Sequence, residues 1–247
     1  TIAFAGTAAA APTVADGEVG VDTDDDGEIE GGTFATLEEA VNDASDGEDI
    51  FIGDGEFSEA VSIEHNLTLR PAAGASPTLT HSGVPLTIAA DKDVTVRGLN
   101  ITAPADTDAI TDSALNSKKL TLRNITIKVS GSSNAFAVTS DGTDGSYDIF
   151  DVTVDGPSSS TEAAAVLLRS PDDVNIKRST FKGLDFGVQI TNEDGSDDKG
   201  AGAVTIRNTT FQDMNDEGVI LNSEDGETSS NNFGAIEIKD NTFENIG

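Results

Sequence analysis

The chain of 247 residues contains no cysteine and no tryptophan, one tyrosine, one methionine and only two histidines. Without cysteine the protein has neither disulfide bridges nor thiol chemistry, and the sequence gives no direct information on its redox compartment. Basic residues are scarce as well, since 14 Lys and Arg stand against 45 Asp and Glu. Binding to nucleic-acid phosphates needs clustered positive charge, so we expect no nucleic-acid partner. No apolar run approaches the ~20 residues of a membrane-spanning helix, and we expect no membrane span.

The acidic excess amounts to a formal net charge of −31. Repulsion on that scale opposes a compact fold unless a high salt concentration screens it. The composition therefore predicts a halophilic protein, of the kind made by haloarchaea. A disordered acidic chain would carry a similar charge, but hydrophobic residues make up 36% of this one and gather in short strand-like segments.

A short pattern of alternating apolar and polar residues recurs seven times. The first copy is Leu-Thr-Leu-Arg at 67–70, and the others begin 26 to 32 residues after the one before, at 94–97, 120–123, 147–150, 174–177, 204–207 and 236–239. Alternation of this kind predicts a strand with one buried face. A turn residue and a second short strand follow most copies, and a third apolar segment precedes them.

Three short strands per repeat cannot bury their inner faces alone, but repeats stacked at the ~4.8 Å strand spacing enclose a continuous core. The sequence therefore predicts an all-β fold, a single right-handed parallel β-helix. An antiparallel sandwich also contains many short strands, but it does not predict the same chemical pattern in the same order in every repeat. The predicted inner positions are Leu67, Leu69, Val94, Val96, Leu120, Leu122, Ile149, Val174, Ile176, Val204, Ile206, Ile236 and Ile238.

The segment before the repeats has a helical pattern. Apolar residues recur at helical spacing between residues 36 and 45, and Thr36 and Glu39 have the spacing of a capping box. A terminal helix of this kind shields the open end of a solenoid core. We therefore expect two parts: residues 1–33 as an N-terminal extension with an acidic linker, and residues 34–247 as the β-helix with a capping helix at about 36–45.

Three consecutive segments resemble the opening of pectin-lyase-like right-handed β-helix proteins. They are Phe-Ala-Thr-Leu-Glu-Glu-Ala-Val at 34–41, Asp-Gly-Glu-Asp-Ile-Phe-Ile-Gly-Asp-Gly-Glu-Phe at 46–57 and Val-Ser-Ile-Glu-His-Asn-Leu-Thr-Leu-Arg at 61–70. The resemblance continues through the repeats to residue 247, and it implies the fold while leaving the function open. That fold carries lyases, hydrolases, epimerases, adhesins, phage spikes and surface-layer proteins.

Enzymes of that family supply motifs that this chain lacks. Polygalacturonase-like members carry Gly-His-Gly, which is absent here, and alginate-epimerase-like members carry Asp-Pro-His, for which the nearest pattern is Ser-Pro-Asp-Asp at 170–173. Pectate-lyase-like catalysis needs an Arg or Lys opposite a calcium-binding acidic cluster, but acidic residues are too common here for a carboxylate pair to be informative. We therefore predict no catalytic residues and no enzyme activity.

An acidic run near the N-terminus is the best candidate for a metal site. Asp22, Asp24 and Asp26, followed by Gly27, match the first half of a calcium-binding loop, in which alternate carboxylates and a glycine turn surround a hard cation. The twelfth position of the loop is Thr33 instead of a glutamate, and such a run also arises by chance in so acidic a chain. The sequence requires no cofactor, and calcium is the one candidate ion.

Basic residues gather at one position of the repeat. Six of the 14 cations take the outward fourth place of the alternating strand, and the one remaining copy, at 147–150, has Phe150 there. We call these six the basic stripe: Arg70, Arg97, Arg123, Lys177, Arg207 and Lys239. Like charges stacked one repeat apart repel, so the stripe needs counter-charges. Aspartates of the neighbouring turns could supply them, or the stripe could bind an acidic partner, either another copy of this protein or an anionic glycan.

Four Asn-x-Thr sequons are present, at Asn66, Asn100, Asn124 and Asn208. In a protein exported past a glycosylating machinery they predict surface glycans. The repeat also produces sequons for a structural reason, because Asn suits turns and Thr suits strands. We expect at least one of the four to be glycosylated.

The two ends of the sequence suggest a mode of assembly. The last repeat stops without the strand that follows in earlier repeats, which leaves the apolar residues around Phe243 and Ile246 open to strand addition. Ile2 and Phe4 lie in an apolar segment that has no partner in the repeat pattern. We expect this segment of one subunit to complete the last coil of the next, which would build a homopolymeric filament. A fragment of a longer β-helix would show the same two ends.

The sequence therefore predicts an extracellular structural protein, a glycosylated subunit of a cell-surface filament or coat. The alternative is a β-helix that binds glycans, as an adhesin or a viral spike does, or one that cleaves them.

Overall fold

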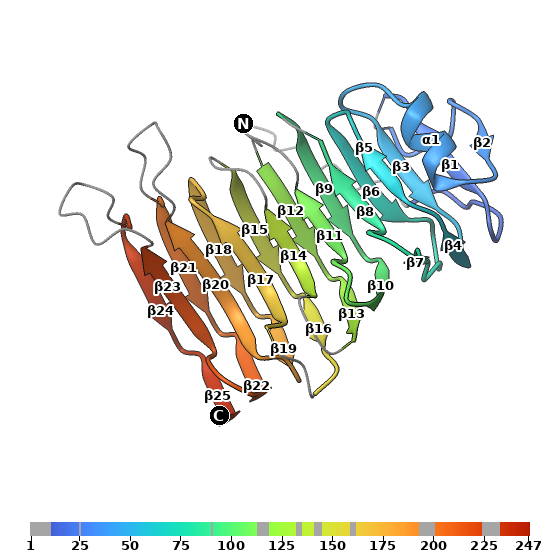
Figure 1. Cartoon of the computed structure of the whole chain (residues 1–247). Coiled ribbons are helices and arrows are strands. Elements are labelled where there is room, and N and C mark those ends of the chain that lie inside the picture. The colour runs from blue at the N-terminus through green and yellow to red at the C-terminus, as the bar shows by residue number, and fades with distance from the viewer. Residues whose placement is uncertain are drawn as a thin grey trace.

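The computed structural model describes residues 11–24, 26–89, 91–112, 119–131, 135–140, 145–158, 162–192, 201–223 and 233–247. Within these ranges the chain forms one short helix and 25 strands, which lie side by side in an elongated stack (Figure 1). The fold is therefore all-β. No helix among the described residues is long and apolar enough to cross a membrane.

The strands belong to three sheets, which we number 1 to 3. Sheet 1 contains, in spatial order, β2 (Thr33–Phe34), β1 (Val19–Asp22), β3 (Asp49–Ile52), β6 (Leu67–Pro71), β9 (Asp93–Arg97), β12 (Lys119–Arg123), β15 (Ser146–Phe150), β18 (Asp173–Lys177), β21 (Ala203–Arg207) and β24 (Ile236–Lys239). Sheet 2 contains β4 (Glu56–Ser58), β7 (Thr78–Thr80), β10 (Asn100–Ala105), β13 (Thr126–Ser130), β16 (Thr153–Asp155), β19 (Thr180–Lys182), β22 (Thr210–Met214) and β25 (Thr242–Ile246). Sheet 3 contains β5 (Val61–Ile63), β8 (Leu86–Ile88), β11 (Ile110–Asp112), β14 (Phe136–Ser140), β17 (Ala164–Arg169), β20 (Phe186–Asn192) and β23 (Val219–Ser223).

From β3 onward each sheet takes every third strand along the chain, and neighbouring strands pair in parallel. The alternating segments found in the sequence lie in register, so that Leu120 is opposite Val94 and Leu122 is opposite Val96. This arrangement confirms the prediction of stacked parallel strands and is compatible with a β-helix. The antiparallel sandwich, the other fold that fitted the strand pattern, is excluded for these strands.

The N-terminal part of sheet 1 is antiparallel. Strand β1 pairs in this sense with both β2 and β3, and its residues Val19 and Val21 are buried. Residues 19–22, within the expected extension and linker at 1–33, thus belong to the sheet, and the expected boundary between residues 33 and 34 falls inside β2. The sequence did not reveal β1 because it stands outside the repeat and is only four residues long.

The helix α1 (Leu37–Asp43) lies at the N-terminal end of the stacked strands (Figure 1). The Thr36 hydroxyl accepts a hydrogen bond from the Glu39 backbone N–H at 3.1 Å, as an N-cap does. The Glu59 carboxylate accepts two more, from the first two N–H groups of the helix, at 2.9 and 2.8 Å. The predicted cap is confirmed, although the helix ends slightly earlier than expected.

The inner faces of the three sheets enclose one apolar core. All predicted inner positions up to Ile206 are buried. The expectation is wrong for Ile236 and Ile238, which are 50% and 43% exposed, because β24 is the outermost strand of sheet 1 in the described chain. Sheet 2 stacks its aromatic rings: Phe211 lies edge-on to Phe181 at 5.7 Å and parallel to Phe243 at 4.9 Å between ring centres.

A column of turn residues links sheet 1 to sheet 2. These residues have positive φ angles between 50° and 69°, and we call them the turn column: Gly98, Asn124, Asp151, Arg178, Asn208 and Asp240. Glycine, asparagine and aspartate tolerate the left-handed conformation better than other residues. The N–H of every column residue but the last donates to the carbonyl that ends the neighbouring sheet 1 strand, for example from Asn124 to Phe150 at 3.1 Å.

Candidate functional surfaces

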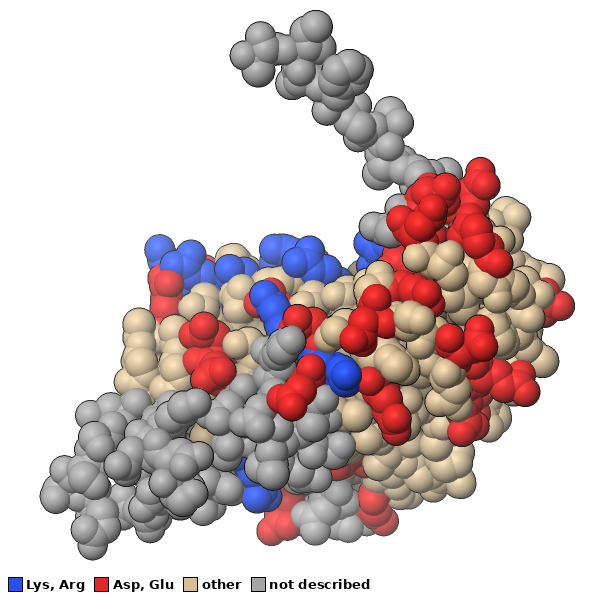
Figure 2. All heavy atoms as spheres, turned by 90° about the horizontal axis from the view of Figure 1, so that it is seen from above, with Lys and Arg blue, Asp and Glu red and all other residues tan. Residues whose placement is uncertain are grey.

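The structure brings the basic stripe together along the end of sheet 1. Arg97 is opposite Arg123, and Lys177 is opposite Arg207, which is opposite Lys239. Figure 2 shows Lys and Arg side chains in a row along one margin of the molecule, whereas Asp and Glu are spread over other parts of the same view. The stripe is thus a basic line on a largely acidic protein.

Two carboxylates and two aromatic rings relieve the repulsion within the stripe. Arg70 forms an ion pair with Asp49, and Arg207 forms one with Glu237. The Arg70 guanidinium also lies over the Phe51 ring, at 4.0 Å from its centre. These pairs place charge or polarisable ring faces beside cations that would otherwise face one another.

Phe150 separates two cations of the stripe. Its ring lies 4.9 Å from the Arg123 guanidinium and 5.8 Å from the Lys177 ammonium. A phenylalanine in the middle of the column therefore replaces a seventh like charge with a ring that attracts cations on both sides.

Two of the aspartates expected as counter-charges lie away from the stripe. Asp93 and Asp173 begin their strands, whereas Arg97 and Lys177 end them. The aspartates and the stripe therefore lie at opposite ends of the strands. Asp151 instead binds Arg178 through two hydrogen bonds of 2.8 and 2.7 Å. That bidentate contact holds the pKa of Asp151 below its ordinary value, and the charge of Arg123 adds to the effect.

Three arginines of the stripe open onto one hollow of about 480 Å³. The residues that line it are Ala11, Arg70, Pro71, Arg97, Gly98, Arg123 and Asn124. A guanidinium group presents a planar fork of donors that matches carboxylate, sulfate and phosphate groups. The hollow can therefore bind an anionic group, and it is the feature of the stripe that most favours a ligand.

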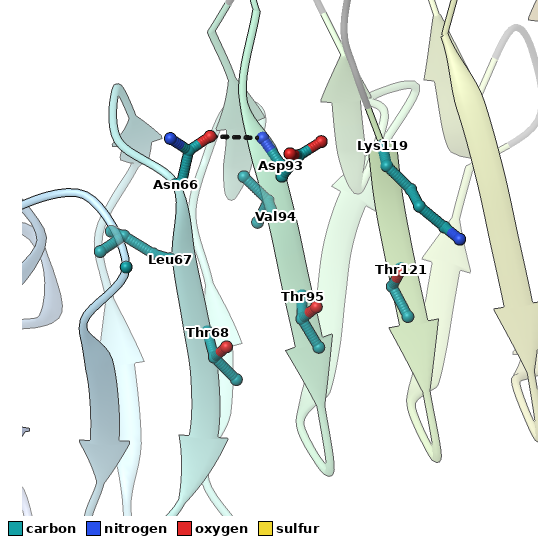
Figure 3. A pocket seen from close by; sticks show the side chains of 9 residues that line it. Asn66, Leu67, Thr68, Asp93, Val94, Thr95, Lys119 and Thr121 are labelled. Carbon is teal, nitrogen blue, oxygen red and sulfur yellow. Dashed lines mark hydrogen bonds between the residues drawn. The ribbon is translucent and has the colours of Figure 1, made fainter. Parts of the chain in front are cut away.

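Two further hollows lie on the outer face of sheet 1. The first, of about 270 Å³, is lined by a ladder of Thr68, Thr95 and Thr121, and the second, of about 380 Å³, adjoins it at Lys119. Figure 3 shows the threonine side chains on successive strands and the hydrogen bond of 2.8 Å from the Asp93 N–H to the Asn66 Oδ1 atom. The only signal of this face in the sequence is the threonine that recurs at the second place of several repeats.

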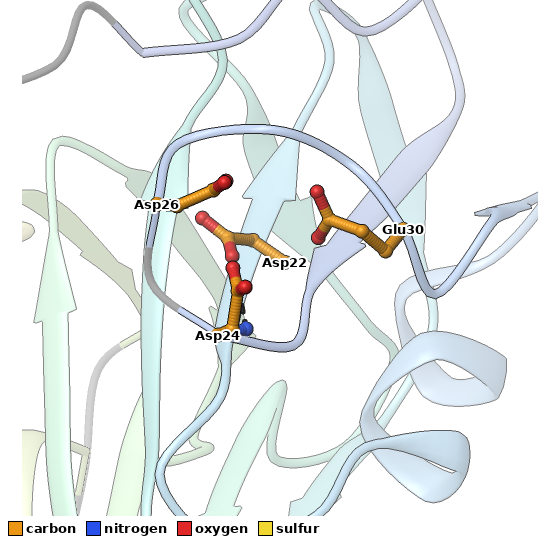
Figure 4. Close-up of side chains that lie close together, drawn as sticks. All are labelled: Asp22, Asp24, Asp26 and Glu30. Carbon is orange, nitrogen blue, oxygen red and sulfur yellow. Dashed lines mark hydrogen bonds between the residues drawn. The ribbon is translucent and has the colours of Figure 1, made fainter.

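The predicted calcium ligands come together with a fourth carboxylate. Asp22, Asp24, Asp26 and Glu30 each offer an oxygen atom, and these atoms lie within 4.8 Å of one another (Figure 4). Glu30 lies outside the calcium-loop pattern, whose twelfth position is Thr33, a residue of β2. Four carboxylates suit a hard cation such as calcium.

The environment of the acidic cluster is asymmetric. Asp22 is fully buried and accepts a hydrogen bond from the Gly27 N–H at 2.9 Å. Partial desolvation, together with the charges of the three aspartates, raises the pKa of Glu30, while a hydrogen bond from the Thr23 backbone opposes the shift. A cation in the cluster would offset this repulsion.

The structure describes two of the four residues that are expected to mediate self-assembly, Phe243 and Ile246. Ile2 and Phe4 lie outside the described residues. Phe243 is 48% exposed and stacks on Phe211, and Ile246 is half-buried against the core.

No protein-family model matches the chain, and no curated protein or solved structure matches it either.

Proposed function

We propose that this chain is an extracellular, self-associating structural protein. Its fold is a single right-handed parallel β-helix of the pectin-lyase-like type, and subunits add to one another at the coil that contains β24 and β25. The handedness follows the general rule for parallel strands joined by crossover connections, which are right-handed in nearly all proteins. The strongly acidic composition supports a high-salt extracellular setting.

The observation that favours this proposal is the apolar surface that β24 and β25 expose. Ile236, Ile238 and Phe243 are 50%, 43% and 48% exposed, whereas the equivalent residues of earlier coils are buried. Complete burial of such a side chain contributes about 1.5–3 kcal/mol, so covering three half-exposed ones contributes roughly half of that for each. Backbone hydrogen bonds along the edge of β24 add to this gain.

The covering segment that we propose is residues 1–10 of a neighbouring subunit, with Ile2 and Phe4 against this surface. The same segment of the subunit itself is the competing occupant. The Pro12 carbonyl accepts a hydrogen bond from the Ala73 N–H at 2.9 Å, just after β6, and six ladder steps of ~4.8 Å separate β6 from β24. Ten extended residues span up to ~33 Å, which exceeds that separation. The test must therefore distinguish contacts within a subunit from contacts between subunits.

Sedimentation and electron microscopy of the purified chain in multimolar salt, over a hundredfold range of protein concentration, test the proposal. We expect assemblies that grow with concentration, and weaker growth for Phe243→Asp. Thr242→Asp is the matched control, because it adds the same charge at an exposed neighbouring position of β25. A monomer at every concentration, or equal assembly of the Phe243→Asp variant, would overturn the proposal.

Deletion of residues 1–10 tests the covering segment. We expect the deletion to leave folded monomers. If the deleted chain still assembles, the last coil is a contact surface but residues 1–10 are not its partner. If the full chain is monomeric and the deletion exposes apolar surface to a dye, the segment covers its own subunit.

A second candidate function is binding of an anionic polymer, which the hollow at Arg70, Arg97 and Arg123 favours. Titration with a polyuronate should show binding that Arg97→Gln weakens and that Lys182→Gln leaves unchanged. Lys182 is a suitable control because it lies on sheet 2, paired with Asp155 at 3.5 Å. We expect no cleavage of the polymer, and turnover would identify a glycan-cleaving enzyme instead.

A further inference from the structure

The four sequons occupy two different structural settings. Asn124 and Asn208 belong to the turn column, whereas Asn100 begins β10 and Asn66 immediately precedes β6. N-glycosylation requires the amide nitrogen of the side chain to be accessible. The structure therefore allows the four sites to be separated, which the sequence did not.

The two turn-column asparagines are exposed and their side chains have no structural role in the described chain. Their backbones are already held, because the N–H of Asn124 donates to the Phe150 carbonyl at 3.1 Å and that of Asn208 donates to the Lys239 carbonyl at 3.3 Å. Neither side-chain amide makes a hydrogen bond with another described residue, and both residues are exposed. A bulky substituent at either nitrogen would extend into solvent.

The nitrogen of Asn100 is engaged in the fold. Its side-chain amide donates to the Ser76 Oγ atom at 3.2 Å and to the Pro77 carbonyl at 3.4 Å. The residue is half-buried within sheet 2. A glycan on this nitrogen would displace at least one of these contacts and would crowd the turn before β7.

Asn66 is also fixed by its neighbours. Its Oδ1 atom accepts from the Asp93 N–H at 2.8 Å, and its backbone N–H donates to Asp46 at 2.7 Å. Its carbonyl accepts from the Gly47 N–H at 2.6 Å. The half-buried side chain lines the 270 Å³ hollow, so a glycan there would lie against the protein surface.

We propose that Asn124 and Asn208 are the N-glycosylation sites of this protein and that Asn66 and Asn100 remain unmodified. In each reaction the amide nitrogen bonds to the anomeric carbon of a lipid-phosphate-linked oligosaccharide, the lipid phosphate leaves, and the nitrogen loses one proton. The inference rests on the exported location included in the proposed function. Three ladder steps separate the two asparagines, so the attachment points lie ~14 Å apart.

Glycans at these positions would cover one flank of the stack. Asn124 follows Arg123 and Asn208 follows Arg207, so each glycan would stand beside the basic stripe, and the one on Asn124 would lie at the mouth of the arginine-lined hollow. The coil with β24 and β25 contains no sequon, and Asn208 stands one ladder step before it. Glycosylation at these sites would therefore hinder binding of a polymer along the stripe.

Glycopeptide mass spectrometry of the protein purified from its own cells tests the inference. We expect glycan on the peptides that contain Asn124 and Asn208, and unmodified peptides for Asn66 and Asn100. In the same cells, Asn124→Gln and Asn208→Gln should each remove one glycan from the intact mass, and Thr126→Ala should act like Asn124→Gln because it destroys the sequon alone. Asn100→Gln is the matched control and should leave the glycan mass unchanged.

Glycan on Asn66 or Asn100, or none on the two turn-column asparagines, would overturn the inference. Self-association is measured separately on the unglycosylated chain, which separates the two proposals. A chain that assembles but carries no glycan contradicts only the modification sites. A chain that carries both glycans but stays monomeric contradicts only the assembly.

Discussion

A buried tyrosine–aspartate pair offers the sharpest test of how the core is held together. The Tyr147 hydroxyl donates to the Asp112 Oδ2 atom at 2.8 Å, and the two residues are only 2% and 0% exposed. Ser140 is a further hydrogen-bond partner of the phenol. The pair connects β15 of sheet 1 to β11 of sheet 3 through the interior. We predict that Tyr147→Phe destabilises the protein although the ring and its packing are kept.

The magnitude follows from the hydrogen bonds that the substitution removes. Phenylalanine removes the donor to Asp112 and the oxygen that contacts Ser140, and water cannot readily replace them at these burials. A hydrogen bond to a charged group contributes about 1.5–3 kcal/mol, and one between neutral groups contributes about 0.5–1.5 kcal/mol. We therefore expect a loss of about 1–3 kcal/mol in the free energy of unfolding.

Denaturant unfolding in high salt, followed by circular dichroism, measures this loss. The companion variant Asp112→Ala removes the other partner, and the double variant Tyr147→Phe with Asp112→Ala closes the cycle. If the hydrogen bond carries the effect, the double variant is less destabilised than the sum of the two single variants. Equal stability of Tyr147→Phe and the unmodified chain, or strict additivity, would refute this account of the pair.

Three further predictions concern pH, metal and salt. Burial first, and then the charge of Asp112, raise the pKa of Tyr147 above its ordinary value of 10.0, so the folded state keeps a proton that the unfolded state loses. Stability should therefore be intact below about pH 10 and fall above it, by up to ~1.4 kcal/mol per pH unit. Because the chain has one tyrosine and no tryptophan, tyrosinate absorbance should appear together with loss of structure, and its appearance in the folded protein would contradict the prediction. Calcium should raise the unfolding midpoint, and a chelator should reverse the rise. The rise should be smaller in Glu30→Gln, and an equal rise in this variant and the unmodified chain would exclude Glu30 as a ligand. Transfer from multimolar to dilute salt should unfold the chain, because 45 carboxylates then repel with little screening, and undiminished stability would refute the halophilic assignment.

The stacking of this chain could be predicted from its sequence because the relevant information is local and repeated. Alternation with period two assigns Leu120 and Leu122 to one face and Thr121 to the other, whatever lies beside them. Recurrence of the same pattern in the same order then places Leu120 opposite Val94, as the structure shows. The N-cap at Thr36 was predictable for the same reason, since both partners of its hydrogen bond lie within one helical turn.

The candidate sites depended on contacts between residues that no local pattern links. The sequence identified the stripe, because a strand ladder aligns equal positions of successive repeats. The sequence did not show how repulsion within the stripe is reduced. That depends on the Phe150 ring lying between Arg123 and Lys177, which only the stacked coils reveal. The sequence likewise named all four sequons as equal, because the hydrogen bonds that distinguish Asn100 run to residues 23 and 24 positions earlier in the chain.

What the sequence determined by itself was thus the fold class, the register of the parallel strands, the capping helix and the column in which the cations stand. The tertiary structure alone decided that β1 joins sheet 1, that Glu30 completes the acidic cluster, and that Tyr147 reaches Asp112 across 35 residues of chain. The physical reason is the same in each case. A repeat fixes which face a side chain takes, but the partner it meets there depends on the path of the loops and on how closely successive coils approach, and these are set only when the whole core packs.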